Sequence, residues 1–201
     1  MIDKKDHMEV ATFQKPKKGN YHSGDSYFYI ETDDGFLCAL ADGLGSGEVA
    51  KDSADTVIDV IRDSHTKPLD ELVHLANQAL FGHHLRGCVL GILRVNYREQ
   101  SYSYVSVGNI SVIAVDHYGK KKRNIPVPGY LSGVKKSVKV HNGDLQNGSV
   151  FFMFSDGVNE RKLTKEFYSH QTMDLTIQWF TLQQEHYMDD DTTLIAMKYS
   201  E

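Results

Sequence analysis

Short apolar runs, several of them with polar residues at alternate positions, follow one another along the chain and predict β-strands. The runs are HMEVATF, DSYFYIET, GFLCALAD, RGCVLGILRVNY, SYSYVSVGN, ISVIAVD, SVKVHN, SVFFMFSD and TTLIAMKYS, which makes about nine strands. Short turn signals separate some of them, at TDDG (32–35), NYREQ (96–100) and DHYG (116–119). Such turns typically join antiparallel neighbours, so we expect a largely antiparallel sheet system.

Helical periodicity interrupts the strand pattern in three places. The first helix carries apolar residues at steps of three and four on one face, namely Ala50, Ala54, Val57, Ile58 and Ile61. Ser46 is the candidate N-cap of this helix. A second helix is expected over 69–81, with Pro68 near its first turn, and a third over 164–184.

The order of these elements predicts the fold class. Strands come first, then two helices, then a longer series of strands, and finally a helix and a strand. Helices that do not alternate regularly with strands are typical of an α+β fold. We therefore expect a single domain over residues 1–201, built as a central antiparallel β-sandwich flanked by helices.

Composition narrows the class of protein further. Of the 201 residues, 40% are hydrophobic and 24% are charged, as in ordinary globular proteins. The net charge of −5 argues against a nucleic-acid partner, because proteins that bind duplexes normally present a basic face. The basic run KKKR at 120–123 is expected to be a solvated turn.

Short segments of the sequence indicate the cellular compartment of the protein and the redox state of its two cysteines. The N-terminal MIDKKDHMEV has no apolar stretch of the kind found in secretory signals, and no apolar run approaches the roughly 20 residues that span a bilayer. We therefore expect a cytoplasmic protein with no membrane partner. Cys38 and Cys88 lie in apolar strand segments without metal-ligand spacing, so we expect two reduced, buried thiols.

Aspartates gather where the expected strands begin or end. Asp42 and Asp156 each follow an apolar strand and precede a glycine, Asp25 stands at the start of an early strand, and the run DDD at 189–191 precedes the last one. A single Asp-Gly pair is most often a plain turn, but its recurrence favours a shared site. Converging carboxylates repel one another and require a cation. Oxygen ligands suit Mg²⁺ or Mn²⁺, whereas zinc favours His and Cys.

The stretch ADGLGSG, at 41–47, has a rival interpretation as a phosphate-binding glycine loop. The dinucleotide fingerprint requires Gly or Ala where this chain has Glu48, which would set an acid against the pyrophosphate. The nucleoside triphosphate loop requires a Gly-Lys pair followed by Ser or Thr, and the sequence contains none. The metal hypothesis is therefore preferred over both nucleotide hypotheses.

The ordered set SGDS, ADGLGSG, RGCVLGIL, SVGNISVI, FSDG and DDDTTLI resembles the PPM family of metal-dependent serine/threonine protein phosphatases, over about residues 20–198. It is more similar to the compact bacterial regulatory branch, which has no sensor domain. The resemblance implies two antiparallel sheets flanked by pairs of helices, with two Mn²⁺ or Mg²⁺ ions in a cleft at one edge. Asp191 stands where relatives have Asn or Asp, and the part implied for it is a supporting one.

The resemblance also implies roles for individual residues. Asp42 would bridge the two ions, and the carbonyl of Gly43 would bind one of them. Asp156 and Asp190 would bind the other ion, and Asp25 would hold metal-bound water. Asp42, Asp156 and Asp190 would thus be catalytic through a water that the ions activate.

The chain departs from the pattern of the larger family members in two places. Leu44 occupies the position of a His suited to proton delivery, so the acid for the leaving alkoxide is unidentified. His22 is either its substitute or a surface histidine. An N-terminal Arg that holds phosphate is also missing, and only Lys15, Lys17 and Lys18 lie nearby in the sequence.

The function implied by the resemblance is hydrolysis of phosphoserine or phosphothreonine on partner proteins. In the compact branch the partners would be phosphorylated STAS-domain proteins of a stress-signalling complex, and the enzyme would be a negative feedback regulator of the general stress response. The alternative is a catalytically inactive phosphatase fold that binds phosphoproteins. The intact acids Asp42, Asp156 and Asp190 argue against it, because clustered carboxylates are costly to keep.

Overall fold

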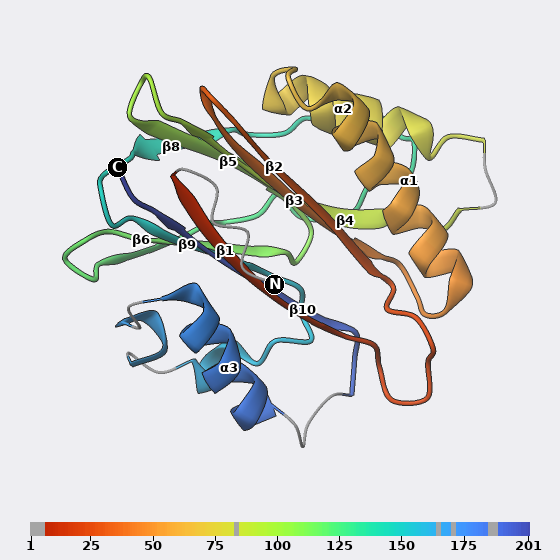
Figure 1. Ribbon diagram of the computed structural model, residues 1–201. Helices are drawn as coiled ribbons and strands as arrows, with labels where there is room; N and C mark the ends of the chain where they lie inside the picture. The colour runs from red at the N-terminus through yellow and green to blue at the C-terminus, as the bar shows by residue number, and fades with distance from the viewer. Residues whose placement is uncertain (1–6, 83–84, 164–165, 170–171, 185–188) are drawn as a thin grey trace.

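Two antiparallel sheets of five strands each make up the centre of the protein (Figure 1). The computed structural model describes residues 7–82, 85–163, 166–169, 172–184 and 189–201. The first sheet has the strand order β1-β10-β9-β6-β7, and the second has the order β2-β3-β4-β5-β8. The predicted α+β sandwich is confirmed.

The elements have the following bounds. The strands of the first sheet are β1 (Met8–Lys15), β6 (Ser111–Val115), β7 (Lys121–Arg123), β9 (Val150–Phe154) and β10 (Thr192–Tyr199). Those of the second sheet are β2 (Asp25–Thr32), β3 (Gly35–Gly43), β4 (Cys88–Asn96), β5 (Ser101–Val107) and β8 (His141–Asp144). The helices are α1 (Glu48–Ser64), α2 (Leu69–Ala79) and α3 (Met173–Gln184), and two short 3₁₀ turns are η1 (Glu160–Lys162) and η2 (Glu166–Ser169).

The central strands of each sheet, β3, β4, β9 and β10, are buried on both faces, which explains their continuous apolar runs. Helices α1 and α2 cover the outer face of the second sheet, and α3 covers the outer face of the first (Figure 1). Neighbouring residues of β9 show the alternation, because Phe151 belongs to the core between the sheets and Phe152 to the core under α3. The fold is thus four layers deep, and its strand ends are held by packing from both sides.

Three local predictions are wrong. Helix α1 is capped by Gly47, with φ of 77° and no side-chain cap, rather than by Ser46. The basic run expected to be a turn pairs instead through Lys121–Arg123 with β6, and its side chains remain exposed on the edge strand β7. The strand expected at SVKVHN begins only at His141. An exposed edge strand needs no apolar face, which is why periodicity missed β7.

The third predicted helix and the two thiols can be compared with the described residues. The helix expected over 164–184 includes residues outside the described part of the chain, and its described part consists of η2 and α3. Cys38 and Cys88 are free and buried, as predicted. Within the described residues, no helix is both long enough and apolar enough to cross a membrane.

Candidate metal centre

The acids lie at one end of the sandwich, where strands of both sheets begin or end (Figure 1, right-hand side). In the second sheet, Asp25 at the start of β2 pairs in register with Asp42 near the end of β3. In the first sheet, Asp156 follows β9 and Asp190 precedes the antiparallel neighbour β10. Chain direction therefore brings four acidic positions to the same end of the molecule.

A cavity of about 180 Å³ opens between these strand ends. Its lining includes the residues predicted from the sequence, Asp42, Gly43, Asp156, Asp190 and Asp191, and in addition Leu44, Gly45, Val89 and Asn109. The lining therefore combines carboxylate groups with the aliphatic side chains of Leu44 and Val89.

Asp25 lies behind this cavity and links the two sheets. Its Oδ2 accepts hydrogen bonds from Ser155 Oγ at 2.7 Å and from Thr193 Oγ1 at 2.6 Å, both in the opposite sheet. Its Oδ1 is buried and has no hydrogen-bond partner among the described residues. Burying a carboxylate oxygen without a hydrogen-bond partner costs free energy of folding. Oδ1 of Asp25 is therefore suited to accept a hydrogen bond from a water beside an ion.

Asp191 closes the loop between β1 and β2 over the site. Its two oxygens accept hydrogen bonds from the backbone N–H of Lys17 at 2.8 Å and of Gly24 at 2.9 Å. Asp190, next to it, lines the cavity. Its Oδ1 accepts a hydrogen bond from the backbone N–H of Asp191 at 3.0 Å and lies 3.9 Å from Lys17 Nζ. Asp191 is thus positioned to shape the site, while Asp190 lies in its lining.

The carboxylates raise one another's pKa. Burial, reinforced by Asp25, Asp156 and Asp190, raises the pKa of Asp42 to about 8. Burial also raises the pKa of Asp25 to about 6, against the hydrogen bonds from Thr193 and Ser155 that lower it. Nearby cations stabilise such a cluster of carboxylates.

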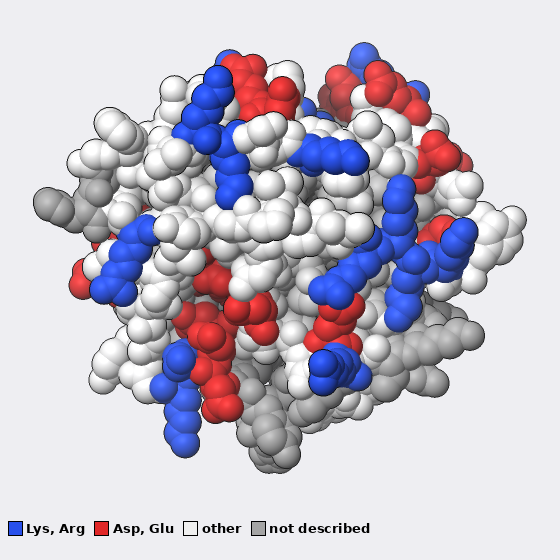
Figure 2. Space-filling model, turned by 180° about the vertical axis from the view of Figure 1, so that it is seen from behind, with Lys and Arg blue, Asp and Glu red and all other residues white. Residues whose placement is uncertain are grey.

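Figure 2 shows the face opposite to the view of Figure 1, where acidic side chains gather below the centre.

The donor atoms at this site suit a hard divalent cation. The carboxylates and the carbonyl of Gly43 offer oxygen only, which hard cations such as Mg²⁺ and Mn²⁺ prefer. Among the described residues, no three His, Cys, Asp or Glu side chains are gathered closely enough to enclose an ion by themselves. Mg²⁺ typically keeps several waters and uses only one or two carboxylates, so the residues fit ions whose shells are completed by water and substrate.

With a chelator present, the protein is expected to lose thermal stability as the pH rises from about 5 to about 8.5. Folding raises the pKa of Asp25 to about 6 and of Asp42 to about 8 from 3.8, so both acids bind protons more tightly in the folded state. Their contribution to stability is complete below about pH 4 and is lost as the pH rises through these values. The side chain that Asp42→Asn introduces cannot ionise. In differential scanning fluorimetry, the melting temperature of this variant should therefore fall less over this pH range than that of the wild type.

The exposed Asp52 on α1 provides the matched control for this measurement. Asp52→Asn removes the same charge at a distance from the acids and should follow the wild type at every pH. Equal losses in the wild type and in Asp42→Asn would contradict the burial of an ionised Asp42.

Sequence reasoning missed three residues that hold the acids in place. Asn109 donates a hydrogen bond from Nδ2 to Asp156 Oδ2 at 2.7 Å, and Ser155 and Thr193 bind Asp25. All three belong to motifs that the sequence did single out, SVGN, FSDG and DDDTTL, but their partners are distant along the chain. His22 is exposed and stands outside the lining of the cavity, whereas Leu44 is part of that lining.

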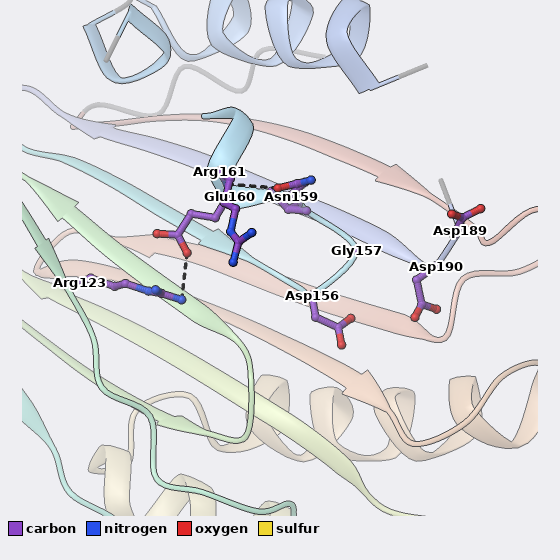
Figure 3. A pocket seen from close by; sticks show the side chains of 9 residues that line it. Arg123, Asp156, Gly157, Asn159, Glu160, Arg161, Asp189 and Asp190 are labelled. Carbon is purple, nitrogen blue, oxygen red and sulfur yellow. Dashed lines mark hydrogen bonds and ion pairs between the residues drawn. The ribbon is translucent and has the colours of Figure 1, made fainter. Parts of the chain in front are cut away.

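A second, larger cavity of about 670 Å³ adjoins the first, because Asp156 and Asp190 line both. Its lining extends from these acids and Asp189, past Gly157, to η1 and to the end of β7 (Figure 3). The acidic site therefore opens into a cavity that is large enough for more than a phosphate group.

Comparisons with known proteins identify the family of this chain. The family model described as Stage II sporulation protein E (SpoIIE) matches residues 32–200. The phosphoserine phosphatase RsbX of Bacillus subtilis (strain 168) is 32% identical over 158 residues, which cover 79% of this chain and 78% of that protein. A crystal structure of RsbX in complex with magnesium covers 100% of this chain and 99% of its own, with a TM-score of 0.91 and 28% identity. A structure from the bacterial stressosome, 23% identical, covers 95% and 98% with a TM-score of 0.84 and shares the fold.

Proposed function

Because this chain belongs to the SpoIIE family of PPM-type phosphatases and is a protein serine/threonine phosphatase, we propose that it removes phosphate from partner proteins with a centre of two Mn²⁺ or Mg²⁺ ions. Asp42 would bridge the ions, the carbonyl of Gly43 would bind one of them, and Asp156 and Asp190 would bind the other. Asp25 would orient a water beside them. The observation that carries this proposal is the cavity lined by Asp42, Asp156 and Asp190, where burial raises the pKa of Asp42 and of Asp156.

The chemistry follows from charge. Divalent ions at this place would supply the positive charge that a phosphate monoester needs and would lower the pKa of a water. The chain's own residues set the geometry: Asn109 holds the carboxylate of Asp156, and Ser155 and Thr193 hold that of Asp25. The hydrogen bonds that Asp191 accepts from the backbone N–H groups of Lys17 and Gly24 hold the β1–β2 loop against the site.

We further propose that the substrates are phosphorylated STAS-domain proteins of a stress-signalling complex in the cytoplasm. Support comes from the 32% identity to the phosphoserine phosphatase RsbX and from the likeness to a stressosome structure. Removing phosphate from such components would oppose the signal that placed it there. The enzyme would accordingly act as a negative feedback regulator of the general stress response.

Phosphate release in the presence of Mn²⁺, of Mg²⁺ and of EDTA tests the proposal. We expect turnover of an aryl phosphate and of a STAS-domain protein phosphorylated on serine or threonine with either ion, and none in EDTA. Turnover of the aryl phosphate alone would contradict the STAS assignment. Binding of the phosphoprotein without release of phosphate from any substrate would instead indicate an inactive binding module.

A further inference from the structure

The larger cavity beside the acids has two ends of opposite charge. Asp156, Asp189 and Asp190 form the acidic end, which adjoins the proposed ions. The other end is formed by Arg123 at the end of β7 and by Arg161 in η1. Figure 3 shows both arginines and the acids around the same opening.

The two arginines differ in the ion pairs and hydrogen bonds that their side chains form. Arg123 Nη2 forms an ion pair with Glu160 Oε2 at 2.9 Å and lies 3.3 Å from Ser111 Oγ. Arg161 donates its backbone N–H to Asn159 Oδ1, but its guanidinium has neither an ion pair nor a hydrogen bond with the described residues. The side chain of Arg161 extends from η1 toward the opening (Figure 3). Among the described residues that line this cavity, Arg161 is therefore the cation that remains available to a ligand.

The charge balance changes when the acidic end holds divalent ions. The ions would offset Asp156 and Asp190, and Glu160 already offsets Arg123. Arg161 then remains the arginine of this lining whose guanidinium forms no ion pair with a described residue, in a cavity of about 670 Å³, a space that accommodates several amino-acid residues. A planar guanidinium favours a carboxylate, which it can bind through two parallel hydrogen bonds.

We propose that this cavity receives the segment of the phosphoprotein next to the phosphorylated residue, and that Arg161 binds an acidic side chain of that segment. The inference rests on the proposed function, because the ions and the phosphate define which end of the cavity is the reactive one. Arg161 is then a specificity-determining residue: it selects phosphoproteins with Asp or Glu near the phosphoserine and takes no part in the hydrolysis.

Paired phosphoserine peptides test this assignment. One peptide of each pair carries Glu at one flanking position and the other carries Ala, so that the pairs together scan both sides of the phosphoserine. We expect kcat/KM of the wild type to favour Glu at one or more positions by about 10-fold, the size expected for a partly desolvated ion pair. Arg161→Ala should abolish this preference through KM and leave turnover of an aryl phosphate unchanged.

Arg98→Ala is the matched control, because Arg98 is an exposed arginine whose partner Asp34 lies outside both cavities. It should retain the full preference. Arg161→Lys should restore only part of it, since an ammonium group cannot form the paired hydrogen bonds. If Arg161→Ala slowed the aryl phosphate as much as the Glu peptides, Arg161 would act on the phosphate itself and the proposal would be overturned.

A binding measurement separates this proposal from the proposed function. Fluorescent peptides with a non-hydrolysable phosphonate in place of the phosphate are titrated with each variant in the presence of Mg²⁺, and anisotropy is recorded. The wild type should bind the Glu peptide more tightly than the Ala peptide, and Arg161→Ala should bind both alike. This result requires no turnover, and equal binding of both peptides by the wild type would overturn the proposal even in an active enzyme.

Discussion

Asp42→Asn is expected to lose at least about 100-fold in kcat/KM for every phosphorylated substrate while keeping its fold, since even outer-shell residues of metal sites typically cost 10- to 100-fold. Asp42 is the acid on which the others act most, because Asp25, Asp156, Asp190 and Asp191 all raise its pKa. Asparagine has nearly the same shape but carries no charge, so it would weaken the binding of both ions that Asp42 is proposed to bridge.

Steady-state phosphate release over a range of Mn²⁺ concentrations checks this expectation. The concentration of Mn²⁺ at half-maximal activity should rise in Asp42→Asn, and a loss of kcat should remain at saturating ion. Asp52→Asn, with the same loss of charge on the exposed face of α1, should match the wild type. Wild-type activity in Asp42→Asn would refute the site assignment even if the family assignment stood.

The same variant also separates a functional role from a structural one. A residue kept for stability destabilises the protein when it is replaced, whereas Asp42→Asn removes buried repulsion and is expected to stabilise the ion-free protein near pH 8. A variant that is inactive yet more stable in EDTA shows that the carboxylate is retained for the ion. Such an exchange of stability for activity is common at functional sites.

The architecture was predictable because both sheets are covered on both faces. A continuous apolar run such as GFLCALAD indicates a strand that is buried on both faces. The three- and four-residue periodicity of α1 indicates a helix that packs one face against such a sheet. The cap of α1 was not predictable in this way. The chain leaves β3 through a path with φ of 103° at Gly45 and 77° at Gly47, which overrides the capping preference of Ser46.

The site was predictable only in part, for a related reason. Acids at strand ends can be inferred to lie at one edge once the strands are known, and the structure brings Asp42, Asp156 and Asp190 to one cavity. The bonds of Asp25 to Ser155 and Thr193 join residues 130 and 168 positions apart, and no local pattern reveals them. Arg161 was missed because nothing in the sequence distinguishes an arginine with a partner from one without.

Gly43→Ala is expected to destabilise the protein by about 3 kcal/mol or more, at or above the upper end of the usual cost of overpacking. An ideal Cβ on Gly43 would lie 2.8 Å from Cα of Ala50 and closer still to its carbonyl group, inside the backbone of α1. Neither side can move easily, because Ala50 is fully buried, Gly43 N–H binds the carbonyl of Gly24 at 3.1 Å and Leu44 N–H binds that of Gly87 at 2.9 Å.

Urea unfolding in EDTA measures this loss without interference from bound ions. Gly47→Ala is the matched control: it places a methyl group where nothing lies within 4 Å, and only the backbone strain of φ 77° and ψ −156° remains, which costs about 1 to 3 kcal/mol. A midpoint for Gly43→Ala equal to that of Gly47→Ala would contradict the close approach of β3 and α1. The expected difference means that the glycine after Asp42 serves the fold through its missing side chain and the proposed site through its carbonyl, so the Asp-Gly pair cannot be a plain turn.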